Sequence, residues 1–132
     1  MTFEKLLSNI NHNIKKIVEE LRERIKEIPE TSEVIDKRQI IYQHYGKEFC
    51  TIKIKKDHLE IDFIVDNTVE DPMEFSWKIK PTIKCDFNRR MQTKNIADID
   101  IVFGLIFQSC NTVNYPRLKA AACSSEYDAR VN

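Results

Sequence analysis

The segment from Ser76 to Lys94 is rich in basic side chains. It holds six basic residues and one acid. Several cations on one surface can meet the phosphates of a polyanion, so the composition predicts a nucleic-acid-binding surface. The residues expected to form it are Lys78, Lys80, Lys84, Arg89, Arg90 and Lys94. Charged residues on an exposed edge strand also prevent edge-to-edge aggregation, and this second explanation stays open.

Residues 76 to 91 alternate in the way that a strand does. One parity is mostly apolar and is expected to face the core: Trp77, Ile79, Pro81, Ile83, Cys85, Phe87 and Met91. Arg89 falls on that inward parity, so its place in the basic surface requires the end of the strand to fray. Pro81 cannot donate a ladder hydrogen bond, which predicts either an edge strand or two strands broken at the proline.

A second basic row lies in "TIKIKKDHLEIDF", residues 51 to 63, which predicts a hairpin. A four-residue turn over residues 56–59 would place Lys55 opposite Glu60 and Lys53 opposite Asp62. We therefore interpret these lysines as structural, because acids on the next strand neutralise them. An acid beside lysines also resembles the residue set of a metal-dependent nuclease, but the cross-strand pairs explain the same residues without catalysis.

Motifs for other chemistry are not found in the sequence. A glycine-rich phosphate loop is excluded because the only glycines are Gly46 and Gly104. The cysteines lack paired spacing, and "DNTVEDPMEF" lacks the ligand spacing of a calcium loop, so we expect neither metal nor cofactor and no catalytic residue. The alternatives are a metal site assembled in space from Cys50 or Cys85 with His44 or His58, and a small enzyme without local motifs.

The composition is that of a soluble globular chain. Of the 132 residues, 42% are hydrophobic and 32% are charged, with 21 basic and 21 acidic side chains. Because the net charge is zero, attraction to a polyanion must come from a local group of charges. No segment reaches the roughly 20 apolar residues of a membrane span, and the first residues do not resemble a signal peptide. We expect a cytoplasmic protein that does not contact a membrane.

Residues 3 to 28 place apolar side chains at helical spacing, with Thr2 as a plausible N-cap. A helix of this length measures about 39 Å, which exceeds a small sheet, so its first turns are expected to overhang. The overhang would form an interaction helix for a protein partner or a homodimer through Phe3, Leu6, Leu7, Ile10 and Ile14. In the alternative interpretation, the whole apolar stripe covers the sheet.

The period changes to two between residues 34 and 91 and returns to helical spacing at residues 95–110. Thr93 or Asn95 can cap the second helix, and Gly104 suggests close packing against the first helix. The predicted fold is α+β: an N-terminal helix, an antiparallel sheet of about four strands in a meander, and a C-terminal helix, with both helices on one sheet face. We expect one domain over residues 1–115 and an irregular tail over 116–132, which is either vector-derived or a frayed terminus.

The order of segments resembles an uncharacterised C-terminal domain of unknown function. The resemblance lies in "LRERIKEI", "RQIIYQHYGKEF", "TIKIKKDHLEIDFIV", "VEDP" and the last strand and helix, "FNRRM" to "ADIDIVFGLIFQSC". Members of that family are often attached to restriction-endonuclease-like domains in chains labelled predicted transport proteins. Many carry a histidine and glycines before the final strand, whereas "KIKPTIKC" has neither. The resemblance implies an accessory module in nucleic-acid metabolism or defence and supplies no catalytic residue.

These observations predict a non-enzymatic accessory binding module that contacts nucleic acid through a basic sheet face. The alternative is a protein-interaction or homodimerisation module that uses the N-terminal helix, and the third possibility is an enzyme without local motifs.

Overall fold

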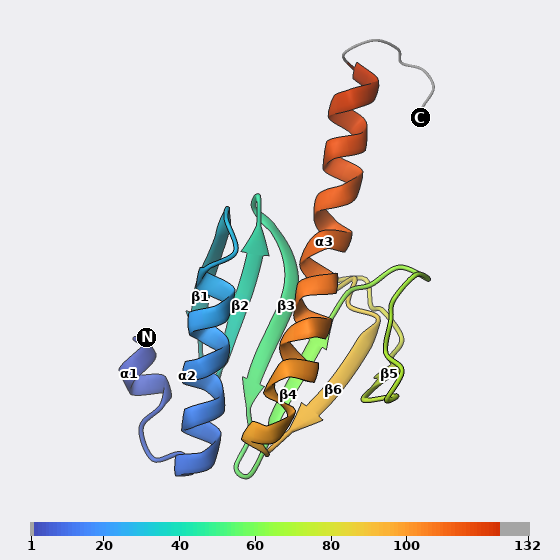
Figure 1. Ribbon diagram of the computed structural model, residues 1–132. Helices are drawn as coiled ribbons and strands as arrows, with labels where there is room; N and C mark the ends of the chain where they lie inside the picture. The colour runs from blue at the N-terminus through green and yellow to red at the C-terminus, as the bar shows by residue number, and fades with distance from the viewer. Residues whose placement is uncertain (1, 125–132) are drawn as a thin grey trace.

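Six strands form one antiparallel sheet in the computed structural model, which describes residues 2–124 and the side chains of residues 2–113. The strands are β1 (Thr31–Asp36), β2 (Gln39–His44), β3 (Lys47–Ile54), β4 (Leu59–Phe63), β5 (Ser76–Lys78) and β6 (Arg89–Thr93). Their spatial order is β1-β2-β3-β4-β6-β5 (Figure 1). The α+β class is confirmed, but the expected four-stranded meander is wrong, because β1 adds a strand before the predicted ones and residues 76–91 divide into two strands, the second option given above for Pro81, with β6 lying between β4 and β5.

The hairpin between β2 and β3 turns through Tyr45 and Gly46, as the glycine predicted. Both residues have positive φ, 52° and 80°, as a two-residue turn between antiparallel strands requires. The next hairpin differs from the predicted register, because Lys53 pairs with Glu60 and Ile54 with Leu59. Its turn therefore spans residues 55–58. This register keeps Leu59 fully buried, whereas a turn over residues 56–59 would have exposed it.

A β-bulge interrupts the pairing of β2 with β3. Tyr42 pairs with Cys50 and Gln43 with Glu48, which leaves Phe49 as an extra residue on β3. Phe49 and Cys50 are consequently both buried although they are neighbours in the chain. The carbonyl oxygen of Phe49 accepts a hydrogen bond of 2.6 Å from the Ser109 hydroxyl. The bulge thus provides a polar contact between the sheet and the last helix.

The N-terminal segment forms two helices, α1 (Phe3–Leu6) and α2 (His12–Lys26), so the continuous helix predicted over residues 3–28 is wrong. Asn9 adopts a left-handed conformation with φ of 64°, and the Asn11 side chain caps α2 by accepting from the Asn13 amide. The two asparagines thus provide the turn conformation and the helix cap that the break between α1 and α2 requires. Thr2 caps α1 as predicted, with its hydroxyl accepting from the Lys5 amide at 3.2 Å.

The break turns α1 back against the rest of the molecule. Leu6, Leu7 and Ile14 are buried in the core, while Phe3 and Ile10 are partly buried against it. The overhanging interaction helix expected from these five residues is therefore not found, because the same side chains complete the core of the chain.

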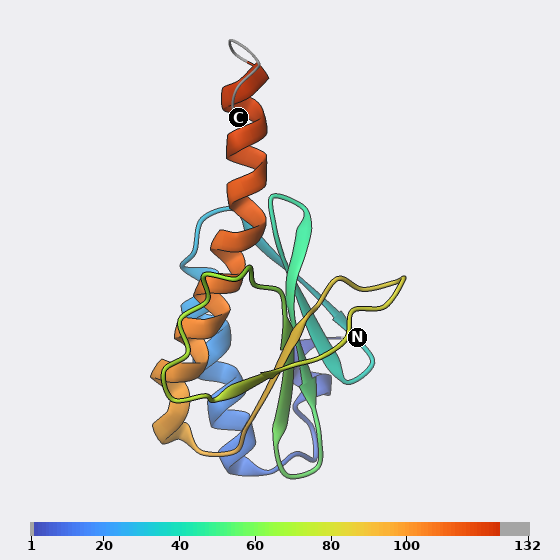
Figure 2. The ribbon, with the colours of Figure 1, turned by 90° about the vertical axis from the view of Figure 1, so that its right-hand side faces the viewer.

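Helices α2 and α3 (Ile99–Ser124) lie side by side on one face of the sheet, as predicted (Figure 1). Helix α3 packs against β2 and β3, and α2 packs against β1 and α3. Figure 2 shows the sheet from its edge, with both helices on one side and the yellow loop of residues 79–88 extending toward the other. The second face, called the open face below, has no helix over it in the described part of the chain.

The last helix begins after a short 3₁₀ turn, η1 (Ile96–Asp98), which Asn95 caps as predicted. Its backbone stays helical through Pro116 to Ser124, so the irregular tail predicted from residue 116 is wrong up to that point. The helix continues past Pro116 although proline lacks the amide that extends the hydrogen-bond ladder. Residues 125–132 of the predicted tail lie outside the described residues.

Part of the last helical region, Ile96–Val113, is long and apolar enough to cross a membrane by length and composition alone. The core helix of a globular domain passes the same test, and here Val102, Leu105 and Ile106 are buried.

Gly104 lies on a different side of α3 from these buried side chains. A Cβ atom built on it meets no atom within 4 Å. The predicted close packing at Gly104 is therefore wrong.

Candidate anion-binding site

The register of the sheet fixes which side chains share the open face, because directly paired residues of antiparallel strands point to the same side. Two rows cross this face. The first crosses all six strands and consists of Val34, Ile41, Thr51, Asp62, Arg90 and Trp77. The second crosses five strands and consists of Asp36, Gln39, Lys53, Glu60 and Gln92.

Two cations and two carboxylates form an ion cluster near the centre of the open face. Arg90 donates to both oxygens of Asp62, at 2.7 and 3.0 Å, and Lys53 donates to the same carboxylate at 3.0 Å. Both cations also lie 3.5 Å from Glu60. Burial raises the pKa of Asp62, but the hydrogen bonds from Arg90 and Lys53 outweigh it and hold that pKa below its ordinary value. The cluster neutralises itself, so Arg90 and Lys53 are not free cations.

Arg89 is also paired. It lies on the inward parity, as the sequence indicated, and the frayed strand end that would expose it is not found. Its Nε donates to the Ser76 hydroxyl at 2.9 Å, and its Nη2 lies 3.8 Å from the Asp71 carboxylate. The amides of Phe75 and Ser76 donate to Asp71 at 2.9 Å. An acid of the loop before β5 thus lies against one of the six cations predicted to bind nucleic acid.

The other four predicted cations are exposed and form no ion pair with the described side chains, but they do not share one face. Lys78 pairs in register with Arg89, which puts it on the helix-side parity. Lys80 and Lys84 lie in the loop of residues 79–88, and Lys94 follows the end of β6. The premise of one continuous basic row is therefore wrong, while the predicted contact of these residues with nucleic acid stays a prediction.

The inward parity predicted for residues 76–87 is wrong over most of its length. Ser76 is buried, while Trp77 is 44% exposed on the open face and Ile83 is fully exposed in the loop. Asp71 explains the inversion at Ser76, because it accepts hydrogen bonds from both the amide and the hydroxyl of that residue. The strand is also only three residues long, so the loop does not continue its alternation.

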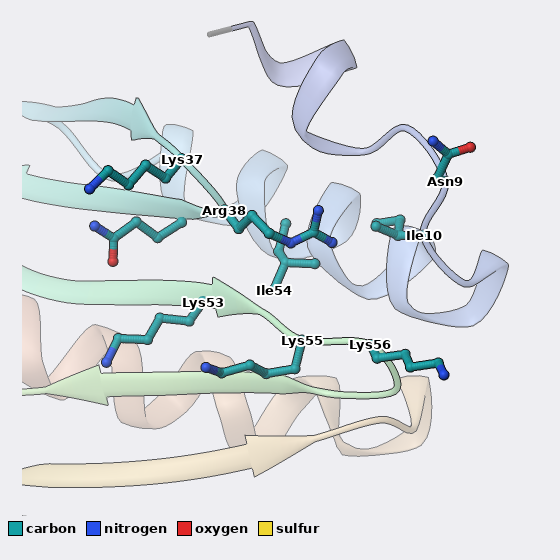
Figure 3. Close-up of a pocket in the computed structure, with 9 residues that line it drawn as sticks. Asn9, Ile10, Lys37, Arg38, Lys53, Ile54, Lys55 and Lys56 are labelled. Carbon is teal, nitrogen blue, oxygen red and sulfur yellow. The ribbon is translucent and has the colours of Figure 1, made fainter.

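A hollow of about 630 Å³ lies at one end of the open face (Figure 3). Three chain segments line it: the link between α1 and α2, the turn between β1 and β2, and the β3–β4 hairpin. Figure 3 shows Lys37, Lys53 and Lys55 extending in the same direction over the strands, with Arg38 reaching toward Ile10. The lining residues are Asn9, Ile10, Lys37, Arg38, Gln39, Lys53, Ile54, Lys55 and Lys56.

Five of these lining residues are cations and none is an acid. Lys53 belongs to the neutral cluster. The other four, Lys37, Arg38, Lys55 and Lys56, form no ion pair with any side chain that the structure describes. The two turns that carry them are joined by a hydrogen bond of 2.9 Å from the Ile54 amide to the Arg38 carbonyl. The hollow therefore concentrates positive charge that no lining acid pairs with, in a chain whose net charge is zero.

Two acids lie next to the hollow without lining it: Asp36 precedes Lys37 at the end of β1, and Asp57 follows Lys56 in the β3–β4 turn. Neither forms an ion pair with the four cations among the described side chains, and the Asp57 carboxylate is hydrogen-bonded to His58 at 2.8 Å. That bond, with help from the positive charge of Lys94, lowers the pKa of Asp57. Of the six cations predicted from the sequence, Lys94 thus lies near the β3–β4 turn at this end of the sheet. Within residues 2–113, no group of three or more His, Cys, Asp or Glu side chains is placed to hold a metal ion.

Sequence reasoning missed most of this site. The structural interpretation of Lys53 is confirmed by its ion pairs, but Lys55 has no acid opposite it, because the register differs from the predicted one. The available signal was the repetition of adjacent cations in two turns, Lys37–Arg38 and Lys55–Lys56. Alternate turns of consecutive antiparallel strands lie at the same end of a sheet, which brings these pairs together.

A family model for a domain of unknown function, DUF5655, matches residues 3–105. The chain belongs to the DUF5655 family. No curated protein and no solved structure is significantly similar to it. The part of the chain matched as a DUF5655 domain includes the whole sheet, both turns that line the hollow and the first part of α3.

Proposed function

We propose that this DUF5655 domain is a non-enzymatic binding module that holds a phosphate-bearing polyanion, nucleic acid foremost, in the hollow at the end of its open face. One observation carries the proposal: four cations without acidic partners, from two turns, line a single concave surface. Phosphate groups are the anions that such a group of lysines and arginine suits best.

The charge distribution supports a local mode of binding. Because the whole chain is neutral, long-range attraction to a polyanion is weak, and affinity must come from contacts within the hollow. Each phosphate contact releases counterions, so binding weakens as salt increases. Four contacts to duplex DNA correspond to a slope of about −3.6 in a plot of log affinity against log salt.

The context suggested by the sequence agrees with this proposal. An accessory role beside a restriction-endonuclease-like domain in nucleic-acid metabolism or defence would require a module that contacts nucleic acid without cutting it. That neighbouring domain and a cytoplasmic location are part of the proposal. The alternative role in homodimerisation has no described surface in its favour, because its helix residues lie in or against the core.

The decisive experiment compares two double variants by fluorescence anisotropy with a labelled 20-mer duplex over a salt series. Lys55→Gln with Lys56→Gln removes two cations of the hollow and is expected to reduce the salt slope by about 1.8, to roughly −1.8. The loss of affinity should be greatest at low salt, where the counterion term is largest.

Lys80→Gln with Lys84→Gln is the matched control, since it removes the same charge from the exposed loop. Under the proposal, this variant keeps the wild-type slope and affinity within about twofold. A reduced slope in this control with an unchanged slope in the Lys55 and Lys56 variant would assign binding to the loop cations predicted from the sequence. That result, or no binding by the wild-type protein at low salt to either the duplex or a single strand of the same length, would overturn the proposed site.

A further inference from the structure

We infer that the open face takes single-stranded nucleic acid in preference to duplex, with phosphates in the basic hollow and a base stacked on Trp77. The inference rests on the proposed function and specifies its ligand. It depends on three features of the described residues: the shape of the hollow, the groups that line it, and the position of the tryptophan on the same face.

The hollow is an open depression of about 630 Å³, within the roughly 300 to 1,000 Å³ of sites that hold one small ligand. A duplex keeps its base edges paired, so it can contact the hollow through its phosphates alone. A single strand is flexible, and one of its nucleotides can enter. The cations that line the hollow can then surround a phosphate from two sides, because they come from two separate turns.

The hollow also offers groups that suit a base or sugar. The side-chain amides of Asn9 and Gln39 line it, and neither has a hydrogen-bond partner among the side chains and backbone that the structure describes. Asparagine and glutamine amides can bond the edges of bases, which single strands leave unpaired. Ile10 is only partly buried and provides an apolar surface beside these amides. The lining thus combines phosphate-binding and base-binding chemistry.

Trp77 lies on the same face as the hollow. In the sheet register, Trp77 pairs with Arg90, and Arg90 pairs with Asp62. Asp62 is two residues along β4 from Glu60, which pairs with Lys53 of the hollow. The indole is 44% exposed, so its ring is accessible to a ligand on this face. Sheets that bind single strands use exposed aromatic side chains as platforms on which bases stack.

The two parts of the site are within reach of a short strand. From β3 to β5 there are three interstrand spacings, about 14 Å, and Lys53 of the hollow lies two residues along β3 from Thr51 in the row of Trp77, which adds about 7 Å along the strand. The ion cluster between them is neutral, so it does not repel the phosphates that would pass over it. Single-strand-binding folds of similar size cover about 4 to 16 nucleotides, so a 12-mer should be long enough to reach both parts.

The test uses the intrinsic fluorescence of Trp77, which is the one tryptophan in the sequence. The full chain is titrated with a 12-mer of deoxythymidine and, separately, with a 12-base-pair duplex, while anisotropy of labelled oligonucleotides reports total binding. The single strand should change the emission of Trp77 in parallel with its anisotropy curve and should bind more tightly than the duplex.

Two variants separate stacking from charge. Trp77→Ala should weaken single-strand binding by roughly 5- to 100-fold and leave duplex binding unchanged, while Trp77→Phe should recover most of the loss because an aromatic face remains. Trp77 is at the sheet edge and half exposed, so both variants should keep the wild-type circular dichroism spectrum.

The possible failures are distinguishable. If anisotropy reports binding but Trp77 emission and Trp77→Ala affinity do not change, or if the duplex binds as tightly as the single strand, then the inference is overturned while the proposed function stands. If neither oligonucleotide binds the wild-type chain, both are overturned.

Discussion

A single substitution at Gly104 can test whether this side of α3 is uncovered. The structure leaves open space where its Cβ would lie, so alanine can be added without a clash. Because glycine costs roughly 1 kcal/mol relative to alanine inside a helix, Gly104→Ala should raise the free energy of unfolding by up to about 1 kcal/mol in urea denaturation. Gly46→Ala is the control and should lower it, since Gly46 has φ of 80°. A destabilising Gly104→Ala would show that something covers this side of α3 in solution.

His44 should make stability depend on pH. Burial lowers the pKa of its imidazole, an effect that Glu30 only partly opposes, and its Nδ1 has no hydrogen-bond partner among the residues that the structure describes. The unfolded chain therefore takes up the proton more readily than the folded chain does. Stability should be full above about pH 6.5 and should fall as the pH decreases below that value.

The check is a series of urea denaturations between pH 7.5 and 5, above the range where carboxyl groups of ordinary pKa titrate. His44→Phe keeps an aromatic ring beside Tyr45 and Phe49 but cannot bind a proton, so it should flatten this dependence. An equal pH slope in both proteins would assign the effect to other groups.

Local signals were reliable at the residue scale. The caps at Thr2 and Asn95 and the turn through Gly46 follow from residue type and are confirmed by their geometry. The ion partners of Arg89 and Arg90 were not predictable in the same way. Asp71 and Asp62 are 18 and 28 positions from them in sequence, and only the sheet order β4-β6-β5 brings these residues together.

At the scale of elements, the N-terminal segment shows why the apolar periodicity predicted one continuous helix where the structure has two. Apolar residues keep helical offsets across residues 7–11, because both α1 and α2 direct their apolar sides to the same core. The break is encoded by Asn9 and Asn11 instead, which favour a left-handed turn and a new helix cap. A periodic pattern identifies a buried face but does not show that one helix carries all of it.

Ile14 distinguishes a core role for this segment from an interaction surface. Its side chain is 1% exposed, so Ile14→Ala should lower the free energy of unfolding by about 2 to 5 kcal/mol. Denaturation measures the loss, and light scattering measures the oligomeric state of wild type and variant. Unchanged stability with an altered oligomeric state would instead favour the interaction helix predicted from the sequence.

At the scale of the whole molecule, the sequence predicted the class of fold better than the location of the site. Two helices on one face of an antiparallel sheet follow from the two periods in the sequence, and this arrangement is observed (Figure 1). The basic hollow was missed because Lys37, Arg38, Lys55 and Lys56 lie in turns, where strand alternation does not apply. Their convergence is a property of topology, which becomes clear only once the strands are ordered.

The bulge at Phe49 also limits how this sheet can change in evolution. Loss of that one residue would leave the β2–β3 ladder regular, with Gln43 still opposite Glu48. The same deletion would remove an aromatic group from the interior and the carbonyl that receives the Ser109 hydroxyl. Relatives in which β3 is one residue shorter would need another contact to hold their final helix against the sheet. The length of β3 and the residue at position 109 should therefore vary together.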